Sequence, residues 1–288
     1  MPLLSETEKL PVKLLILGDS GTGKSGSLAS LALAGYKLRI LAYDDGLSVL
    51  AAHIRKADPA ALANVSAITL ADTIKQVGTN QVFAGQPTAF SRGLALCDNW
   101  KDGEHDLGKP SEWGTDTVLV IDSLTRMSQA AFNFALALNN SGPFDANMTH
   151  YNVAQQLIER FLQKLVAGNL RCNVIVIAHI SYWFEATTTV KKMETTTMRT
   201  AASADATADT ISKAFPMALG RALSPRIMAY FNDAILATKK FTGNGTKEVR
   251  YFSTRPTTQL DLKSSIVEPP AELSLTTGLL DYFRLCGG

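Results

Sequence analysis

A short apolar run at 12–17 leads directly into the sequence Gly-Asp-Ser-Gly-Thr-Gly-Lys-Ser at 18–25. This octet matches the pattern G-x-x-x-x-G-K-[ST] without exception, and the residues that follow it read as a helix that stops at Gly35. A buried strand that enters a glycine-rich turn and then a helix is the context this pattern requires. The octet therefore predicts a phosphate-binding loop in an α/β fold.

Each residue type in this loop has a chemical reason to be there. Glycines allow backbone torsions that turn successive N–H groups inward as an anion nest, and the helix adds its positive end. The Lys24 ammonium can reach β- and γ-phosphates, and the Ser25 hydroxyl can hold Mg²⁺. We therefore expect ATP and Mg²⁺ as cofactors, bound through a continuous stretch: Gly18, Asp19, Ser20, Gly21, Thr22, Gly23, Lys24, Ser25 and Gly26.

Apolar runs alternate with amphipathic stretches through the first 180 residues, which favours a mostly parallel sheet with helices on both faces. The expected strands lie at 12–17, 38–43, 65–70, 118–121 and 173–178, and the clearest helices at 25–34, 49–56 and 153–166. We predict one domain over 1–288, with three departures from the alternation. They are an insertion or long connection at 78–117, a mobile Thr/Ala/Ser-rich loop at 181–209, and a C-terminal hairpin and helix within 226–288.

Composition excludes several other classes of protein. Hydrophobic residues make up 46% of the 288 residues, which excludes global disorder, and the net charge of +2 announces no strongly charged partner. Three scattered cysteines provide no disulfide framework. The sequence has no run of eighteen apolar residues, the length that a membrane-spanning helix needs. The acidic N-terminus lacks an export signal, so we expect a cytoplasmic protein without a membrane partner. For the tryptophans of the insertion, Trp100 and Trp113, local packing is the favoured interpretation, with stacking on adenine or covering of the nucleotide as alternatives.

Three further polar residues lie at strand ends. Asp122 ends an apolar strand and is expected to complete the Mg²⁺ site with Ser25. The residue directly after Asp122 is Ser123, which is not a carboxylate and cannot serve as the base. Asp45, which follows the strand at 38–43, is therefore the candidate base that orients the attacking water. His179 ends the strand at 173–178 and precedes the loop at 181–209, so it can sense the terminal phosphate. We predict Lys24, Asp45, Asp122 and His179 as the catalytic set.

The order of these motifs resembles that of the RecA-type recombinase core. The resemblance rests on 18–25, the acidic turn at 44–46, the strand at 118–122 with its following Ser-Leu-Thr, and 174–179, and it extends over 12–260. The sequence is most similar to the small phage-encoded RecA-core ATPases of the single-strand annealing-associated Sak group. This implies an ATPase that binds single-stranded DNA in homologous recombination or strand annealing.

The resemblance also implies partners and residue roles. Such proteins assemble head to tail as a filament or ring, in a bacterial cytoplasm, alongside an annealing or single-strand-binding protein. Asp45 falls where recombinases carry a catalytic Glu, and His179 where a Gln links the γ-phosphate to the second DNA-binding loop. That loop matches 181–209, and Arg255 falls near a basic residue that reaches a neighbour's nucleotide. The basic residues of the loop are candidate DNA contacts: Lys191, Lys192 and Arg199.

Two alternatives stay open at this point. A small-molecule or nucleotide kinase uses the same loop, with Asp44 or Asp45 as the base for a substrate hydroxyl and 181–209 as a lid. The second alternative is an ATP-gated assembly protein that hydrolyses little ATP. Asp45 has a shorter side chain than the Glu of recombinases, which would make it a less efficient base for hydrolysis.

Overall fold

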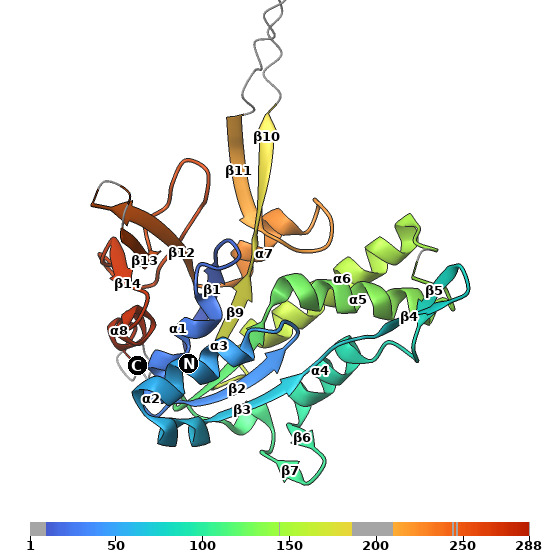
Figure 1. Cartoon of the computed structure of the whole chain (residues 1–288), viewed down its shortest axis with the longest axis horizontal. Coiled ribbons are helices and arrows are strands. Elements are labelled where there is room, and N and C mark those ends of the chain that lie inside the picture. Colours follow the sequence, from blue (N-terminus) through green and yellow to red (C-terminus); the bar gives the residue numbers. More distant parts are fainter. Residues whose placement is uncertain (1–9, 144, 186–209, 244, 246, 288) are drawn as a thin grey trace, which may run out of the picture.

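A central sheet of eight strands forms the middle of the protein (Figure 1). The computed structural model describes residues 10–143, 145–185, 210–243, 245 and 247–287. The strands of this sheet are β1 (Lys13–Leu17), β2 (Lys37–Ala42), β3 (Val65–Thr69), β8 (Thr117–Asp122), β9 (Asn173–Ala178), β12 (Asp233–Thr242), β13 (Lys247–Ser253) and β14 (Glu272–Ser274). Their order is β14-β13-β12-β1-β9-β8-β2-β3, parallel from β12 to β3 and antiparallel for β13 and β14.

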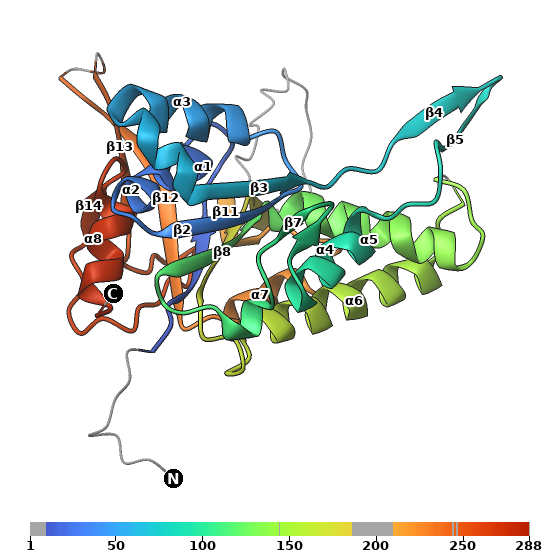
Figure 2. The ribbon, with the colours of Figure 1, turned by 90° about the horizontal axis from the view of Figure 1, so that it is seen from below.

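Helices cover both faces of the sheet, and the central strands β1, β8 and β9, which are mostly apolar, are therefore buried along their whole length. One face carries α1 (Lys24–Ser27), α2 (Ala29–Leu33), α3 (Leu47–Ala57) and α8 (Gly278–Leu285). The other face carries α4 (Ala89–Asp98), α5 (Leu124–Leu138), α6 (Met148–Val166) and α7 (Ser224–Tyr230). Figure 2 shows α3 on one side of the sheet and α5 and α6 on the other.

The strand order puts the predicted motifs at one edge. Strand β9 lies between β1 and β8, and the carboxyl ends of β1, β9, β8 and β2 point the same way because all four are parallel. This is the sheet of a RecA-type core with a C-terminal hairpin extension, so the predicted fold class is confirmed. The residues that follow these strands are gathered where ligands bind in open parallel sheets.

The connection at 78–117 is built of regular elements. A protruding hairpin begins before this range with β4 (Ile74–Val77) and ends within it with β5 (Asn80–Phe83) (Figure 2). The range then contains α4, the short pair β6 (Lys101–Asp102) and β7 (His105–Asp106), and the 3₁₀ turn η3 (Pro110–Glu112). A second 3₁₀ turn, η2 (Pro59–Asn64), precedes β3. Trp100 is only 1% exposed, and its ring centroid lies 5.7 Å from that of Trp113. The two tryptophans are packing anchors, as expected.

The segment predicted as a loop at 181–209 begins as a strand. Strands β10 (Ile180–Glu185) and β11 (Thr210–Pro216) form an antiparallel ribbon directly after His179, and 186–209 lie outside the described residues. The prediction of a loop is therefore wrong for 181–185. Cross-strand aromatic packing is the reason, since the Trp183 and Phe215 centroids are 4.6 Å apart.

The C-terminal part confirms the predicted hairpin and helix. β12 and β13 pair from Leu236 with Ser253 to Thr242 with Lys247. Helix α8 begins at Gly278, after Glu272–Ser274 have paired with β13 as β14. The carboxylate of Asp233 is buried and accepts hydrogen bonds from Tyr282 and from Ser265, which fastens this part to the sheet.

Replacing Trp100 by alanine tests whether the 78–117 connection belongs to the core. The substitution leaves a cavity beside Trp113 and is expected to lower the free energy of unfolding by about 3–5 kcal/mol. Denaturant unfolding measures this, with Val267→Ala as the control because Val267 is 89% exposed. A loss as small as that of the control contradicts the packing role.

Candidate nucleotide-binding site

The phosphate loop is folded around its lysine. Lys24 is 6% exposed, and its Nζ donates hydrogen bonds to the carbonyl oxygens of Gly18 at 2.7 Å and Asp19 at 2.8 Å. Gly21 and Gly23 have φ values of 74° and 94°, which glycine adopts without a steric penalty. A Cβ on Gly18 would lie 2.5 Å from the carbonyl oxygen of Ala237, so β12 approaches the loop too closely for a side chain.

Ser25 and Asp122 lie together at the start of α1. Asp122 is 4% exposed, and its carboxyl group is hydrogen-bonded to the Ser25 side chain. Burial raises the pKa of this carboxyl group. Within the described ranges, no group of three or more His, Cys, Asp or Glu side chains could hold a metal ion. One carboxylate and one hydroxyl nevertheless fit Mg²⁺, which is usually held by one or two protein oxygens together with substrate phosphates.

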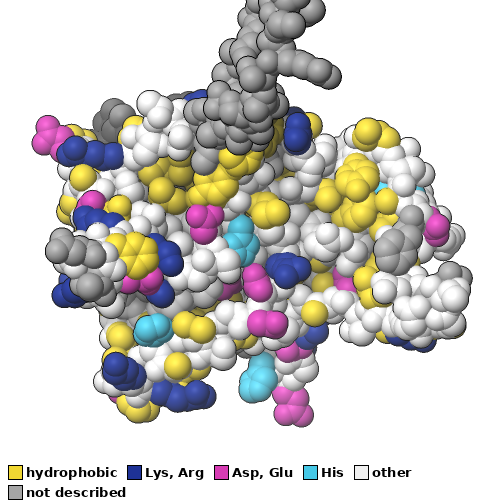
Figure 3. All heavy atoms as spheres, turned by 45° about the horizontal axis from the view of Figure 1, so that its top comes forward, with side chains coloured by type: hydrophobic (Ala, Val, Ile, Leu, Met, Phe, Trp, Pro, Cys, Tyr) yellow, Lys and Arg dark blue, Asp and Glu magenta, His cyan; other side chains and the backbone are white. Residues whose placement is uncertain are grey.

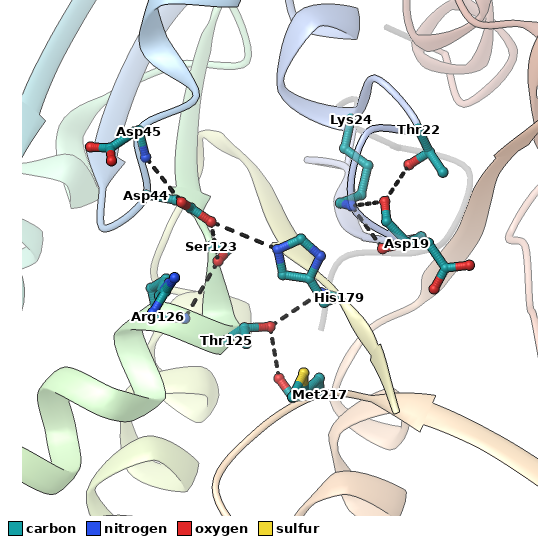
Figure 4. A network of polar contacts seen from close by, with 11 residues as sticks. Asp19, Thr22, Lys24, Asp44, Asp45, Ser123, Thr125, Arg126, His179 and Met217 are labelled. Carbon is teal, nitrogen blue, oxygen red and sulfur yellow. Dashed lines mark hydrogen bonds and ion pairs between the residues drawn. The ribbon is translucent and has the colours of Figure 1, made fainter. Parts of the chain in front are cut away.

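Asp44 is the carboxylate that faces the site, whereas the prediction named Asp45. The Asp44 Oδ2 lies 3.4 Å from the Ser123 hydroxyl oxygen and 3.7 Å from Nε2 of His179. Asp45 is exposed, and its side chain points away from Lys24 and His179 (Figure 4). The reason lies in the backbone, because the Asp44 N–H donates to the Asp122 carbonyl at 3.1 Å and holds Asp44 beside β8.

His179 lies where the prediction placed it, at the mouth of the site. Its backbone N–H donates to the Thr125 hydroxyl at 3.2 Å (Figure 4). Its carbonyl accepts from the Met217 N–H at 2.7 Å. Partial burial, followed by the nearby Lys24 charge, lowers the pKa of the imidazole. His179 is therefore neutral at neutral pH and can donate one hydrogen bond to a phosphate.

The site is a cavity of about 430 Å³ between the phosphate loop and the ends of β2, β8 and β9. The cavity is lined by Lys24, Ser25, Asp44, Asp122, His179 and, from the C-terminal hairpin, Arg250. The predicted residue of that hairpin, Arg255, lines a different cavity beside Pro269 and Pro270. Arg255 follows the end of β13, whereas Arg250 lies in the part of the strand that runs past the phosphate loop. A contact of Arg255 with a neighbouring copy stays a prediction.

Three features of the site escaped the sequence analysis: Arg250, Gly46 and a bond from Tyr182 to Asp19. A Cβ on Gly46 would lie 2.8 Å from the Ser25 hydroxyl oxygen and 3.1 Å from Asp122 Oδ2. The pairing of the hairpin strands favours Arg250 over Arg255 as the residue near the phosphates. Leu236 of β12 pairs with Leu17 at the end of β1, and Arg250 lies opposite Lys239, three residues further along β12. Lys191, Lys192 and Arg199 lie outside the described residues.

A phosphate loop, an acidic strand end beside it and an intervening strand define a P-loop ATPase with a RecA-type core. The family model described as "AAA domain" matches residues 10–222, and the chain belongs to that family. The chain is therefore an ATPase of the P-loop class. No curated protein matches the sequence.

Two solved structures show only a distant likeness. An ATPase from the type III secretion system of pathogenic bacteria shares 13% identity over 80% of this chain and 52% of its own, with a TM-score of 0.39. This chain thus spans about half the length of that protein. The flagellar accessory protein FlaH from Methanocaldococcus jannaschii shares 8% identity over 89% of this chain and 91% of its own, also with a TM-score of 0.39. Among the described helices, none has the length and apolar character to span a bilayer.

Gly46→Ala tests the assignment of Ser25 and Asp122 to the magnesium site. The new methyl group would press on both side chains, so we expect weaker Mg²⁺-dependent nucleotide binding. A magnesium titration of ATP binding measures the effect. Gly85→Ala is the control, because a Cβ there meets nothing within 4 Å; equal affinities in the two variants would contradict the assignment.

Asp122→Asn tests the electrostatics of the same site. A raised pKa in the folded state means that the ionised carboxylate lowers stability at neutral pH, a cost that vanishes as the pH falls through that pKa. The variant is therefore expected to melt at or above the wild-type Tm at neutral pH, to lose any gain in acid, and to bind Mg²⁺-ATP weakly. Thermal unfolding across pH measures this, and a clearly lower Tm at neutral pH would contradict it.

Proposed function

We propose that this ATPase binds single-stranded DNA in an ATP-dependent manner and acts in phage-type homologous recombination or strand annealing, like the Sak-group proteins that its motifs resemble. One observation carries the proposal. The strand that ends in the nucleotide site, β9, continues through His179 into the β10–β11 ribbon, which leads to the Thr/Ala/Ser-rich segment 186–209 and its candidate DNA contacts. His179 thus provides one link between the state of the nucleotide and the position of the ribbon.

A second contact joins the ribbon to the phosphate loop. The Tyr182 hydroxyl donates a hydrogen bond of 2.9 Å to the Asp19 carboxylate, and burial, with this bond, raises the Tyr182 pKa to about 12. The Asp19 carbonyl is also a partner of Lys24, so a phosphate that takes over the lysine changes the surroundings of Asp19. The ribbon therefore has two connections to the site, one at His179 and one at Asp19.

The ribbon offers the chemistry that single strands require, which is aromatic faces for bases and cations for phosphates. Tyr182 is 37% and Phe184 56% exposed, and the Arg221 guanidinium carbon lies 5.9 Å from the Trp183 ring centroid. Hydrophobic side chains gather on the surface next to the ribbon (Figure 3). We assign Lys191, Lys192 and Arg199 as further contacts to the DNA backbone.

For hydrolysis we assign Asp44 as the base that orients water, supported by the Ser123 hydroxyl and His179 at its Oδ2. Lys24 and His179 hold the terminal phosphate, and Ser25 with Asp122 holds Mg²⁺, which supplies charge neutralisation when bound. The protein is expected to work as a homo-oligomeric filament or ring, with an annealing or single-strand-binding protein as partner.

Oligonucleotide binding tests the proposal. A labelled single strand is expected to bind the wild-type protein with a non-hydrolysable ATP analogue and much more weakly with ADP. Tyr182→Phe removes the bond to Asp19 and should reduce this difference, while Tyr36→Phe, in a tyrosine that packs on Phe283, should leave it unchanged. Equal and negligible DNA binding in both nucleotide states would remove the proposed function and leave only the ATPase.

A second cavity beside Asp44 supports the kinase alternative. About 250 Å³ in volume, it lies on the other side of Asp44 and is lined by Asp45, Arg126 and Asn133. A small acceptor with a hydroxyl group would have Asp44 as its base there. ADP production that requires an added acceptor and ignores DNA would favour the kinase; phosphate release in the absence of any acceptor would exclude it.

A further inference from the structure

The C-terminal hairpin packs directly on the phosphate loop. Leu17 pairs with Leu236, so the following residues of β12 and their partners on β13 run beyond β1 and alongside the loop. A Cβ on Gly23 would lie 2.4 Å from Cδ2 of Leu275, which shows how closely this part of the chain approaches the loop. Among the residues of β12 and β13, Arg250 is the one that lines the nucleotide cavity.

Arg250 lies on that inner face. It sits opposite Lys239, and both share a face with Ala237 and Phe252, which pack in the core beneath α1 and α2. The Arg250 Nη1 atom lies 3.7 Å from the position a Cβ would take on Gly23. Lys24 and Arg250 are the two lysine or arginine side chains among the described residues that line the nucleotide cavity.

The guanidinium of Arg250 already has an anionic partner that a phosphate can replace. Its Nε lies 2.7 Å from Oε1 of Glu248, whose Oε2 is 3.3 Å from Nζ of Lys239. Glu248 would keep the lysine if the arginine moved, so the exchange leaves no carboxylate without a cation. Arg250 is 45% exposed in the side chain, which leaves it free to turn. Arginine binds phosphate through two parallel hydrogen bonds, a stronger pairing than most surface ion pairs.

We propose that Arg250 binds the phosphates of the nucleotide held by its own chain, exchanging Glu248 for phosphate oxygens. The hairpin then closes the cavity from the side opposite His179, and Glu248 competes with the nucleotide for the arginine. This inference deepens the ATPase site and rests on nucleotide binding at 18–25; it does not depend on DNA binding.

Equilibrium binding of a fluorescent ATP analogue and of ADP, each with Mg²⁺, tests the exchange. Arg250→Ala is expected to weaken binding of the ATP analogue by about tenfold or more, since it removes charge-assisted hydrogen bonds. Glu248→Gln is expected to change affinity in the opposite direction, because it removes the competitor. Lys240→Ala and Glu272→Gln are the matched controls, since Lys240 of β12 and Glu272 of β14 form an ion pair on the other face of the sheet.

Unchanged affinity for both nucleotides in Arg250→Ala, or weaker binding in Glu248→Gln, overturns the inference while the ATPase site stands. Absence of nucleotide binding by the wild-type protein overturns both. Thermal unfolding of each nucleotide-free variant separates a lost contact from a folding defect.

A mixing experiment tests the claim that the contact lies within one chain. Lys24→Ala retains Arg250, and Arg250→Ala retains Lys24, so the two proteins are combined and ATP hydrolysis is measured. A contact within one chain predicts no more activity than the sum of the separate variants. Restored activity in the mixture would show that Arg250 serves a neighbouring copy and would overturn the proposal.

Discussion

A lysine ammonium that has two backbone carbonyls as partners determines the shape of the phosphate loop. The charge of Lys24 is buried, and burial lowers its pKa, while the negative charges of Asp122, Asp19 and Asp44 act in the opposite direction. The carbonyl oxygens of Gly18 and Asp19 accept the hydrogen bonds that hold the ammonium in place. A phosphate is a stronger partner than a neutral carbonyl. The two carbonyl oxygens and a phosphate therefore compete for Lys24, and binding of a nucleotide has to change the hydrogen-bond partners of its ammonium.

Two other groups around the cavity also have protein partners that a phosphate could replace. Arg250 is held by Glu248, and His179 lies within 3.7 Å of Asp44. Each group can exchange a protein partner for the nucleotide, and each belongs to a different element: the loop, the C-terminal hairpin and the end of β9. Under our proposals, three parts of the chain would contact an arriving triphosphate, and one of them, the end of β9, leads into the separate β10–β11 ribbon.

Much of the fold and the chemistry of the loop could be predicted from sequence. Apolar strands that end in Gly18, Asp122 and His179 fix a parallel sheet, and parallel strands bring those ends together whatever their order. The choice between Asp44 and Asp45 could not be predicted, because it depends on the backbone bond from Asp44 to the Asp122 carbonyl across two strands. Arg250 and Arg255 are equally plausible by composition, and only the hairpin register separates them. The ribbon at 180–185 was missed because its stabilising partner, Phe215, lies beyond a long polar stretch.

The central claim is that this loop binds a magnesium nucleotide through its amides and Lys24. Isothermal titration calorimetry of the full chain with Mg²⁺-ATP tests it most directly, with Lys24→Ala as the paired sample. The account predicts saturable heat at one site per chain for the wild type and none for the variant. No heat from the wild type, or the same heat from both proteins, would contradict it.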